Sequence, residues 1–167
     1  AANGTPADQP AANTPADSQP AQPKPDSKTI TVAKTGPLVG LDQHANSDGV
    51  SLEVIATLLD GLVTLDAEGN LVPTMAERWD VSDDGLTYTF YLRDAQWSNG
   101  TPVTAADFEY SWKRNVDPAT ASNYNYEAVT AGIKNAEAII NGEMASSELG
   151  VTAKDDKTLV VELDHIV

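Results

Sequence analysis

The sequence contains no cysteine, so disulfides, thiolate metal ligands and cysteine nucleophiles are excluded within these 167 residues. It also lacks any run of about 18 apolar residues, the length that a membrane-spanning helix requires. The first residues do not show the basic and then apolar pattern of a signal peptide. If the protein is exported, we therefore expect that its signal has already been removed.

Basic side chains are scarce. The chain has 10 Lys and Arg residues against 25 Asp and Glu residues, which gives a formal net charge of −15. Residues 1–28 contribute only −1 to this charge, because they carry three Asp and two Lys, so the remaining residues are the acidic part. An acidic body repels phosphate backbones, which excludes nucleic acid as a partner and disfavours direct binding to anionic membranes.

Residues 1–28 also lack every large apolar side chain. They hold six of the ten prolines and seven alanines, with no Val, Ile, Leu, Met or aromatic residue. Such a segment cannot bury enough surface to offset its ordering entropy, so we expect it to be disordered. Two interpretations remain open: an end of the chain without a task, or a stiff, proline-rich tether that holds a domain away from a surface.

From Thr29 onward the pattern is that of a mixed α/β or α+β domain. Alternating apolar residues predict strands, and apolar residues three or four positions apart predict helices. A capping box of Thr104 and Asp107 is expected to begin one helix, and Gly142 is expected to stop another. The expected strands cover residues 29–33, 62–66, 86–93, 149–154 and 158–164, the expected helices cover 49–62, 104–117 and 131–141, turns are expected at 67–70, 99–100 and 155–156, and residues 74–81 are expected to form a helical turn leading into a strand.

Few residues suggest chemistry. His44 and His165 have no partner at a spacing typical of metal ligands, so both are expected to be structural. Residues 66–70 offer oxygen ligands but lack the EF-hand pattern, which favours an ordinary turn over a calcium site. No catalytic motif occurs, so we expect no catalytic residue, no metal and no cofactor, and a binding role is favoured over an enzyme.

The aromatic residues fall into two groups. Trp79, Trp97 and Trp112 lie in or beside segments with apolar faces, so we expect them to pack in the core. Tyr124 and Tyr126 lie in a polar stretch between two predicted helices, where core packing and ligand contact are both open interpretations.

A series of short motifs occurs in order along the chain: Gly61-Leu62-Val63, Pro73, Ala76-Glu77-Arg78-Trp79, Leu92-Arg93, Trp97-Ser98-Asn99-Gly100, Pro102-Val103-Thr104-Ala105, Asp107-Phe108, Tyr110-Ser111-Trp112 and Asp117-Pro118. Leu41-Asp42-Gln43-His44 lies upstream of them, and the stretch "ELGVTAKDDKTLVVEL" lies near the end. With these motifs, the segment from Leu58 to Ser122 resembles the N-terminal region of the oligopeptide-binding proteins of ABC importers, which are extracytoplasmic solute-binding proteins of family 5 (OppA/DppA-like). The upstream motif corresponds to Leu-Asp-Pro-His in that family, with Gln43 in place of proline, and the stretch near the end is also similar.

The resemblance implies an α/β fold of the periplasmic-binding-protein type II class (cluster C, peptide-binding), of which this chain is the N-terminal part. Residues 1–28 would be the tether, and residues 29–59 would begin the first lobe and include a loop that borders the ligand. Residues 60–160 would form a mixed α+β extra domain of that lobe. Residues 161–167 would be a truncated return strand, and the second lobe would lie outside this chain.

The resemblance also implies the function. The protein would capture extended oligopeptides outside the membrane by sequence-tolerant backbone pairing, and the permease subunits would recognise its closed form. The ligand-binding residues carried over by position are Ser47, Asp48, Gly49, Val50 and Tyr124. The protein would be a monomer, either periplasmic or anchored to the outer face of the membrane by a lipid on a cysteine just upstream of Ala1.

Two alternatives remain open. The same scaffold could bind another ligand, namely a dipeptide, a murein peptide, a peptide pheromone, or a nickel or haem complex. The acidic body and the tether are also compatible with a surface adhesion or interaction module, which would need no pocket.

Overall fold

The computed structural model describes residues 30–166, and the chain divides after Ala33 into two units. The strand predicted at residues 29–33 is wrong for residues 30–33, which belong to no strand. A strand needs a hydrogen-bonded neighbour, and no described strand pairs with these residues. Thr29 and the predicted tether over residues 1–28 lie outside the described residues.

The second unit is built on a four-stranded antiparallel sheet with the strand order β3-β4-β6-β5. β3 covers Ala76–Val81, β4 covers Thr87–Leu92, β5 covers Val151–Asp155 and β6 covers Thr158–Glu162. Phe90 of β4 pairs with Leu159 of β6, and both contribute to the core on one face of the sheet. The strands predicted at residues 86–93, 149–154 and 158–164 are confirmed, although the last turn lies at residues 156–157.

A separate hairpin joins β1 (Val63–Leu65) to β2 (Leu71–Pro73), which confirms the strand predicted at residues 62–66 and the turn predicted at 67–70, whereas β2 itself was not predicted. One oxygen of the Asp66 carboxylate accepts hydrogen bonds from the backbone N–H groups of Glu68 and Asn70, at 3.0 and 2.8 Å. Gly69 adopts a φ of +83°, which glycine tolerates without steric cost. Residues 66–70 therefore form an ordinary turn. The helical turn predicted before β3 is wrong, since residues 74–75 form a bend that leads directly into the strand.

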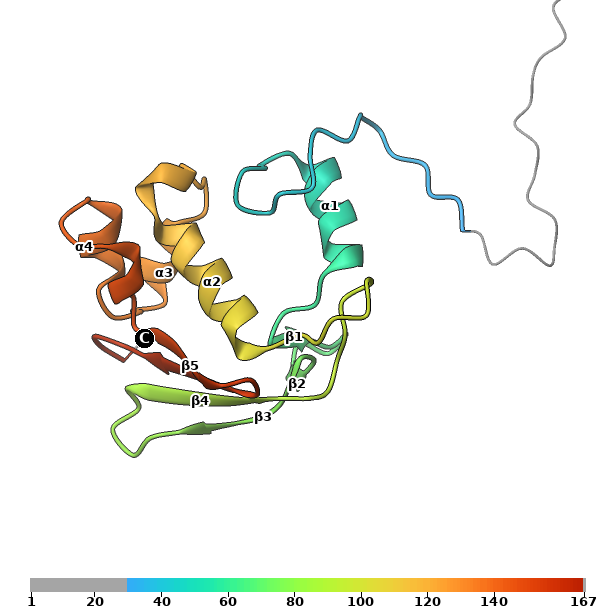
Figure 1. Ribbon diagram of the computed structural model, residues 1–167. Coiled ribbons are helices and arrows are strands. Elements are labelled where there is room, and N and C mark those ends of the chain that lie inside the picture. Colours follow the sequence, from blue (N-terminus) through green and yellow to red (C-terminus); the bar gives the residue numbers. More distant parts are fainter. Residues whose placement is uncertain (1–29, 167) are drawn as a thin grey trace, which may run out of the picture. The chain divides into compact units, whose positions relative to one another are not determined.

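Helix α2 (Ala105–Val116) begins and ends where the sequence predicts. The Asp107 carboxylate accepts a hydrogen bond from the backbone N–H of Thr104 at 2.8 Å, which completes the expected capping box. Asp117 is extended and Pro118 begins a 3-10 helix, η1 (Pro118–Thr120). Figure 1 shows α2 lying over one face of the sheet. The core between them contains the buried residues Ala76, Leu92, Ala105, Val116, Ile139, Val151, Leu159 and Val161.

The helix predicted at residues 131–141 is wrong in its first half, whereas its second half is confirmed and ends before Gly142, which adopts a φ of +77° as expected for a helix stop. The structure has two short helices, α3 (Tyr126–Thr130) and α4 (Ala136–Ile140), followed by the 3-10 helix η2 (Ser146–Glu148). Gly132 and Asn135 adopt positive φ angles of 66° and 67°, which interrupt the helix. Between them, the N–H of Lys134 donates to the carbonyl of Glu162 and the carbonyl of Lys134 accepts from Gly150, both at 2.9 Å. These contacts with β6 and the start of β5 replace helical hydrogen bonds.

Helix α1 (Gly49–Leu58) is shorter than the predicted helix at residues 49–62. Leu59 is extended, and the carbonyl of Gly61 accepts hydrogen bonds from the hydroxyl of Thr74 and the N–H of Met75. Because of these contacts, the helix does not continue to residue 62. Only Ser51 and Ile55 of α1 are buried, whereas Leu58 is 62% exposed. Within residues 30–166, no helix combines the length and the apolar character that a membrane span requires.

Candidate ligand-binding site

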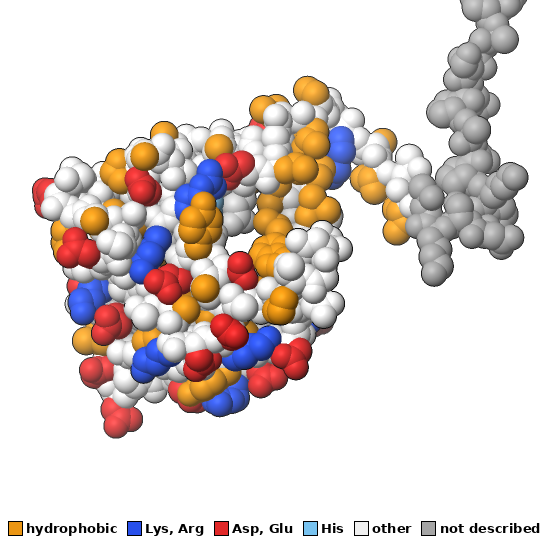
Figure 2. Space-filling model, in the orientation of Figure 1, with side chains coloured by type: hydrophobic (Ala, Val, Ile, Leu, Met, Phe, Trp, Pro, Cys, Tyr) orange, Lys and Arg blue, Asp and Glu red, His pale blue; other side chains and the backbone are white. Residues whose placement is uncertain are grey.

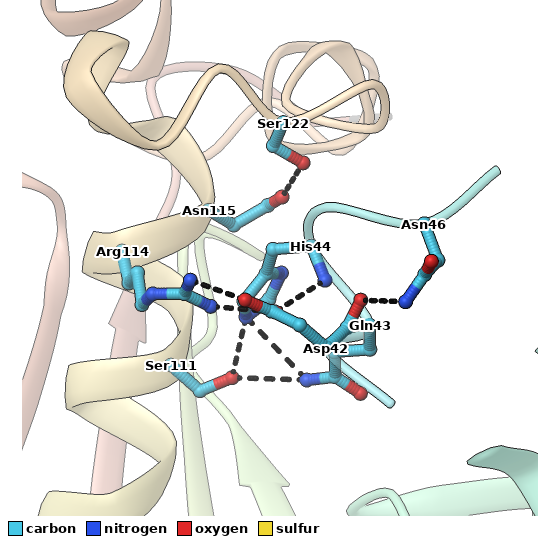
Figure 3. A network of polar contacts seen from close by, with 8 residues as sticks. All are labelled: Asp42, Gln43, His44, Asn46, Ser111, Arg114, Asn115 and Ser122. Carbon is cyan, nitrogen blue, oxygen red and sulfur yellow. Dashed lines mark hydrogen bonds and ion pairs between the residues drawn. The ribbon is translucent and has the colours of Figure 1, made fainter. Parts of the chain in front are cut away.

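An ion pair fixes the loop of residues 42–46 to helix α2 (Figure 3). The Arg114 guanidinium donates to both oxygens of the Asp42 carboxylate, at 2.8 and 2.5 Å. The hydrogen bond from Arg114 is the main reason that the pKa of Asp42 falls to about 2, with a further hydrogen bond from the His44 N–H. Within the loop, the buried Asn46 amide donates to the Asp42 carbonyl at 2.8 Å. The loop is therefore closed by an internal hydrogen bond and joined to α2 by the ion pair.

His44 and Gln43 make the second contact with α2. The His44 Nε2 lies 3.1 Å from the Ser111 hydroxyl, and the Gln43 amide donates to the same hydroxyl at 3.2 Å. Burial is the largest cause that lowers the pKa of His44, and the nearby Arg114 charge lowers it further. The ring is therefore neutral near pH 7. His44 has a structural hydrogen bond, as predicted, and it also lines a cavity described below.

Tyr124 is positioned by a short chain of hydrogen bonds that starts on α2. The Asn115 amide donates to the Tyr124 carbonyl at 3.3 Å, and the Tyr124 N–H donates to the Ser122 hydroxyl at 3.2 Å. That hydroxyl in turn donates to Asn115 at 2.6 Å. The backbone at Tyr124 is therefore fixed before any ligand arrives. The Tyr126 ring lies 6.5 Å from the Tyr124 ring and is 56% exposed.

These elements line a cavity of about 560 Å³ that is open to solvent, and we call it the Tyr124 cavity. It combines aromatic faces, aliphatic side chains and hydrogen-bonding groups, which is the usual composition of a small-ligand site. The surface is visibly hollowed between α1 and α2 in Figure 2. The lining residues are Gln43, His44, Leu52, Trp112, Asn115, Tyr124, Glu127, Ala128, Ala131 and Ile133.

Two further cavities adjoin the same elements. One of about 600 Å³ lies between α1 and α2 and is mostly apolar, with Leu52, Phe108 and Trp112 among its lining residues. The other, of about 330 Å³, includes Trp97, which is 41% exposed. The prediction that all three tryptophans belong to the core is therefore wrong for Trp97, because its segment loops out between β4 and α2. Trp79 is half-buried with its ring 6.4 Å from that of Phe90, and it lies outside the core cluster. Trp112 packs against the core and lines two cavities.

The loop Ser47–Val50 stands apart from the Tyr124 cavity, since none of its residues lines it. Asp48 caps α1 by accepting a hydrogen bond from the Ser51 N–H at 2.8 Å, which lowers the pKa of Asp48. Ser47 and Gly49 are exposed, and Val50 is half-buried. The structure thus gives Asp48 a local structural role. A ligand contact by Ser47–Val50 stays a prediction.

Sequence reasoning missed part of the lining of the Tyr124 cavity. Asn115 and Glu127 belong to no motif, and neither was predicted as a site residue. Gln43 and His44 belong to a matched motif, which was the available signal for their position beside a site. Within residues 30–166, no three His, Asp or Glu side chains lie close enough together to hold a metal ion.

Comparison with known proteins gives consistent matches over most of the chain. A sequence profile described as bacterial extracellular solute-binding proteins, family 5 Middle, matches residues 70–166. The periplasmic oligopeptide-binding protein OppA of Haemophilus influenzae is 49% identical over 127 residues, which are 75% of this chain and 24% of that protein. The periplasmic murein peptide-binding protein MppA of Escherichia coli is 50% identical over 114 residues, or 68% of this chain and 21% of that protein.

The solved structures agree with this comparison. The crystal structure of Haemophilus influenzae OppA in complex with RPPGFSPFR matches with a TM-score of 0.73 and 47% identity, over 76% of this chain and 25% of that one. The present chain therefore spans about a quarter of the length of the relatives that it matches.

Proposed function

Because the chain belongs to the bacterial extracellular solute-binding proteins of family 5, we propose that the intact protein is the substrate-binding component of a peptide ABC importer. It captures extended oligopeptides outside the membrane and delivers them to the permease. One relative binds the peptide RPPGFSPFR and another is named as a binder of murein peptides. These relatives support a peptide as the ligand of the intact protein.

The observation that carries the proposal is the Tyr124 cavity. An extended peptide presents backbone N–H and C=O groups together with varied side chains, so its binder needs hydrogen-bonding groups beside roomy pockets. Asn115, His44 and Gln43 supply polar groups, and Trp112 and Tyr124 supply ring faces. The hydrogen bonds that fix Tyr124 reduce the ordering cost of binding, because this wall is formed in advance.

The remaining features of the proposal concern the whole protein. Residues from about 29 to 59 begin a first lobe, residues 60–160 form its extra domain, and Ser47–Val50 borders the peptide together with Tyr124. Closure of a second lobe over the peptide presents the complex to the permease subunits. The protein acts as a monomer, and residues 1–28 serve as a tether to a lipid anchor or to a periplasmic location.

Calorimetry tests the proposal. The intact protein carrying residues 1–167 is titrated with a panel of tripeptides to hexapeptides of mixed sequence, and its fold is checked by circular dichroism. We expect saturable heat with several unrelated peptides, because backbone recognition tolerates sequence. A folded protein that gives no heat with any peptide would reject the proposed function.

A further inference from the structure

We infer that the Tyr124 cavity prefers a basic side chain, Lys or Arg, of the bound peptide, with the Glu127 carboxylate as its counter-charge. This inference rests on the proposed function, since it assumes that a peptide occupies the cavity. It names the class of side chain that one wall of the site favours.

The first argument comes from the charged residues around the cavity. Glu127 is the only acidic residue among the ten that line it, and no Lys or Arg lines it. His44 contributes no positive charge near pH 7, because burial and Arg114 lower its pKa. Arg114, the cation nearest to His44 in this network, is committed to both oxygens of Asp42. The cavity therefore carries a negative charge without a resident cation.

The second step is that the Glu127 carboxylate is not already engaged. None of the ion pairs among the described residues includes it. Glu127 lies in the first turn of α3, and the residue is exposed at the open side of the cavity that it lines. A carboxylate that lines a cavity and has no described ion-pair partner is free to pair with a cation from a ligand.

The third step is the match in shape and polarity. Lys and Arg have long aliphatic stems with a charged end, so they bury the stem against apolar groups and keep the charge at a polar rim. Leu52, Ala128 and Ile133 offer an apolar wall for the stem. The rings of Trp112 and Tyr124 are suitable partners for a cation. An acidic ligand side chain would instead meet Glu127 as a like charge.

The fourth argument comes from the electrostatic field that the net charge of the chain produces. The formal net charge of −15 on these 167 residues adds a general attraction for cationic over anionic ligands in this part of the protein. This general field cannot distinguish one position along a peptide from another. A preference confined to one peptide position therefore identifies the cavity and separates its effect from that of the net charge.

The test uses the intact protein and peptides that differ at one position. Each position of a tetrapeptide is occupied in turn by Lys, by norleucine of similar length, or by Glu, and each dissociation constant is measured by calorimetry. At one position we expect Lys to bind about fivefold more tightly than norleucine, the ratio typical of one partly exposed ion pair, and Glu to bind most weakly.

Variants of the protein then locate the preference. Glu127→Gln should reduce the Lys-to-norleucine ratio at that position to the small preference that the rings of Trp112 and Tyr124 retain, and Glu127→Lys should invert the ranking of the Lys and Glu peptides. Glu137→Gln is the matched control, because Glu137 lies in the first turn of α4 and does not line the Tyr124 cavity. This control should keep the wild-type ratio.

Two results would overturn the inference while leaving the proposed function intact. One is the binding of all peptides without a preference for Lys at any position. The other is a Lys preference that persists unchanged in Glu127→Gln. A folded protein that binds none of the peptides would reject the proposed function itself, and the inference with it.

Discussion

At the scale of single residues, the pair of Asp42 and Arg114 explains how the loop of residues 42–46 keeps its place beside the cavity. Both oxygens of Asp42 are used by one guanidinium, a geometry that gives direction as well as attraction. Because both side chains are partly exposed, the pair contributes less to stability than a buried pair would. Its main effect is to fix where Gln43 and His44 lie.

The same pair gives a prediction on pH. The folded-state pKa of Asp42, about 2, lies below its ordinary value of 3.8, so the pair stabilises the fold above pH 4 and loses this effect as pH falls toward 2. Wild type should therefore be more stable than Asp42→Asn at pH 6, and urea unfolding should show the difference shrinking between pH 4 and pH 2. A difference that stays constant over this range would contradict the assigned pKa.

Tyr124 gives a prediction on binding. Tyr124→Ala in the intact protein should weaken peptide binding about tenfold, since a ring that contacts a ligand is lost, while the melting temperature stays nearly unchanged. Tyr110→Ala is the matched control, because Tyr110 is 69% exposed on α2 and lines none of the three cavities. Equal loss of affinity in both variants, or a large loss of stability in Tyr124→Ala, would remove Tyr124 from the site.

Gly150 gives a prediction on packing. A Cβ atom at this position would lie 2.6 Å from the Cβ of Lys134 and 2.8 Å from the carbonyl oxygen of Glu162, so the backbone would have to move. Gly150→Ala should lower the free energy of unfolding by about 2 kcal/mol, as measured by urea titration. Gly49→Ala serves as the control, because nothing lies within 4 Å of its added Cβ. Equal free energies of unfolding in the two variants would contradict this prediction, because the backbone at Lys134 would then move without measurable cost.

At the scale of elements, the side-chain carboxylate of Glu109 connects helix α2 to strand β5. One oxygen of Glu109 accepts from the Ala153 N–H on β5 at 2.7 Å, and the other accepts from Lys113 at 2.5 Å. Burial opposes ionisation of Glu109, but these two hydrogen bonds outweigh it and the pKa of Glu109 is lowered. Because β5 is an edge strand, this contact also occupies a backbone donor that would otherwise be exposed or unpaired.

Removal of this carboxylate should therefore loosen the contact between α2 and β5. Glu109→Ala should cost about 2 kcal/mol of unfolding free energy, because the partly buried Ala153 N–H loses its acceptor. Hydrogen exchange of the Ala153 amide should become faster. Lys113→Ala, which removes only the pair within the helix, should cost about 0.5 kcal/mol or less and leave that amide protected. Unchanged exchange at Ala153 in Glu109→Ala would contradict this account.

The elements also show which predictions the sequence could support. The strand at residues 86–93 and helix α2 follow from local patterns, namely strict alternation in one and a capping box with a proline stop in the other. The break between α3 and α4 depends on Lys134 bonding to Gly150 and Glu162, which are distant in sequence. Local periodicity contains no information on such contacts, and the helix predicted at residues 131–141 is wrong in its first half for this reason.

At the scale of the whole molecule, the resemblance in sequence predicted the family and the mixed α/β fold, and both are confirmed. The site was predictable only in part. Tyr124 came from its position in the resemblance, whereas the ten-residue lining of its cavity depends on α1, the loop of residues 42–46, α2 and α3 meeting in space. The contact of Ser47–Val50 with a ligand remains a prediction, because these residues do not line that cavity.

Helix α1 is poorly covered by the rest of the described chain. Leu58 and Leu59 are 62% and 40% exposed, and an apolar cavity of about 600 Å³ lies between α1 and α2. The chain spans about a quarter of the length of the relatives that it matches.

The central claim is that the Tyr124 cavity forms one wall of a peptide-binding site. The most direct measurement is a crystal structure of the intact protein grown with a peptide that binds in calorimetry. We predict that a peptide side chain lies in the cavity against Tyr124 and Trp112, with peptide polar groups within hydrogen-bond distance of the cavity's polar side chains. A peptide bound elsewhere, with the cavity filled by the protein's own residues, would contradict the account.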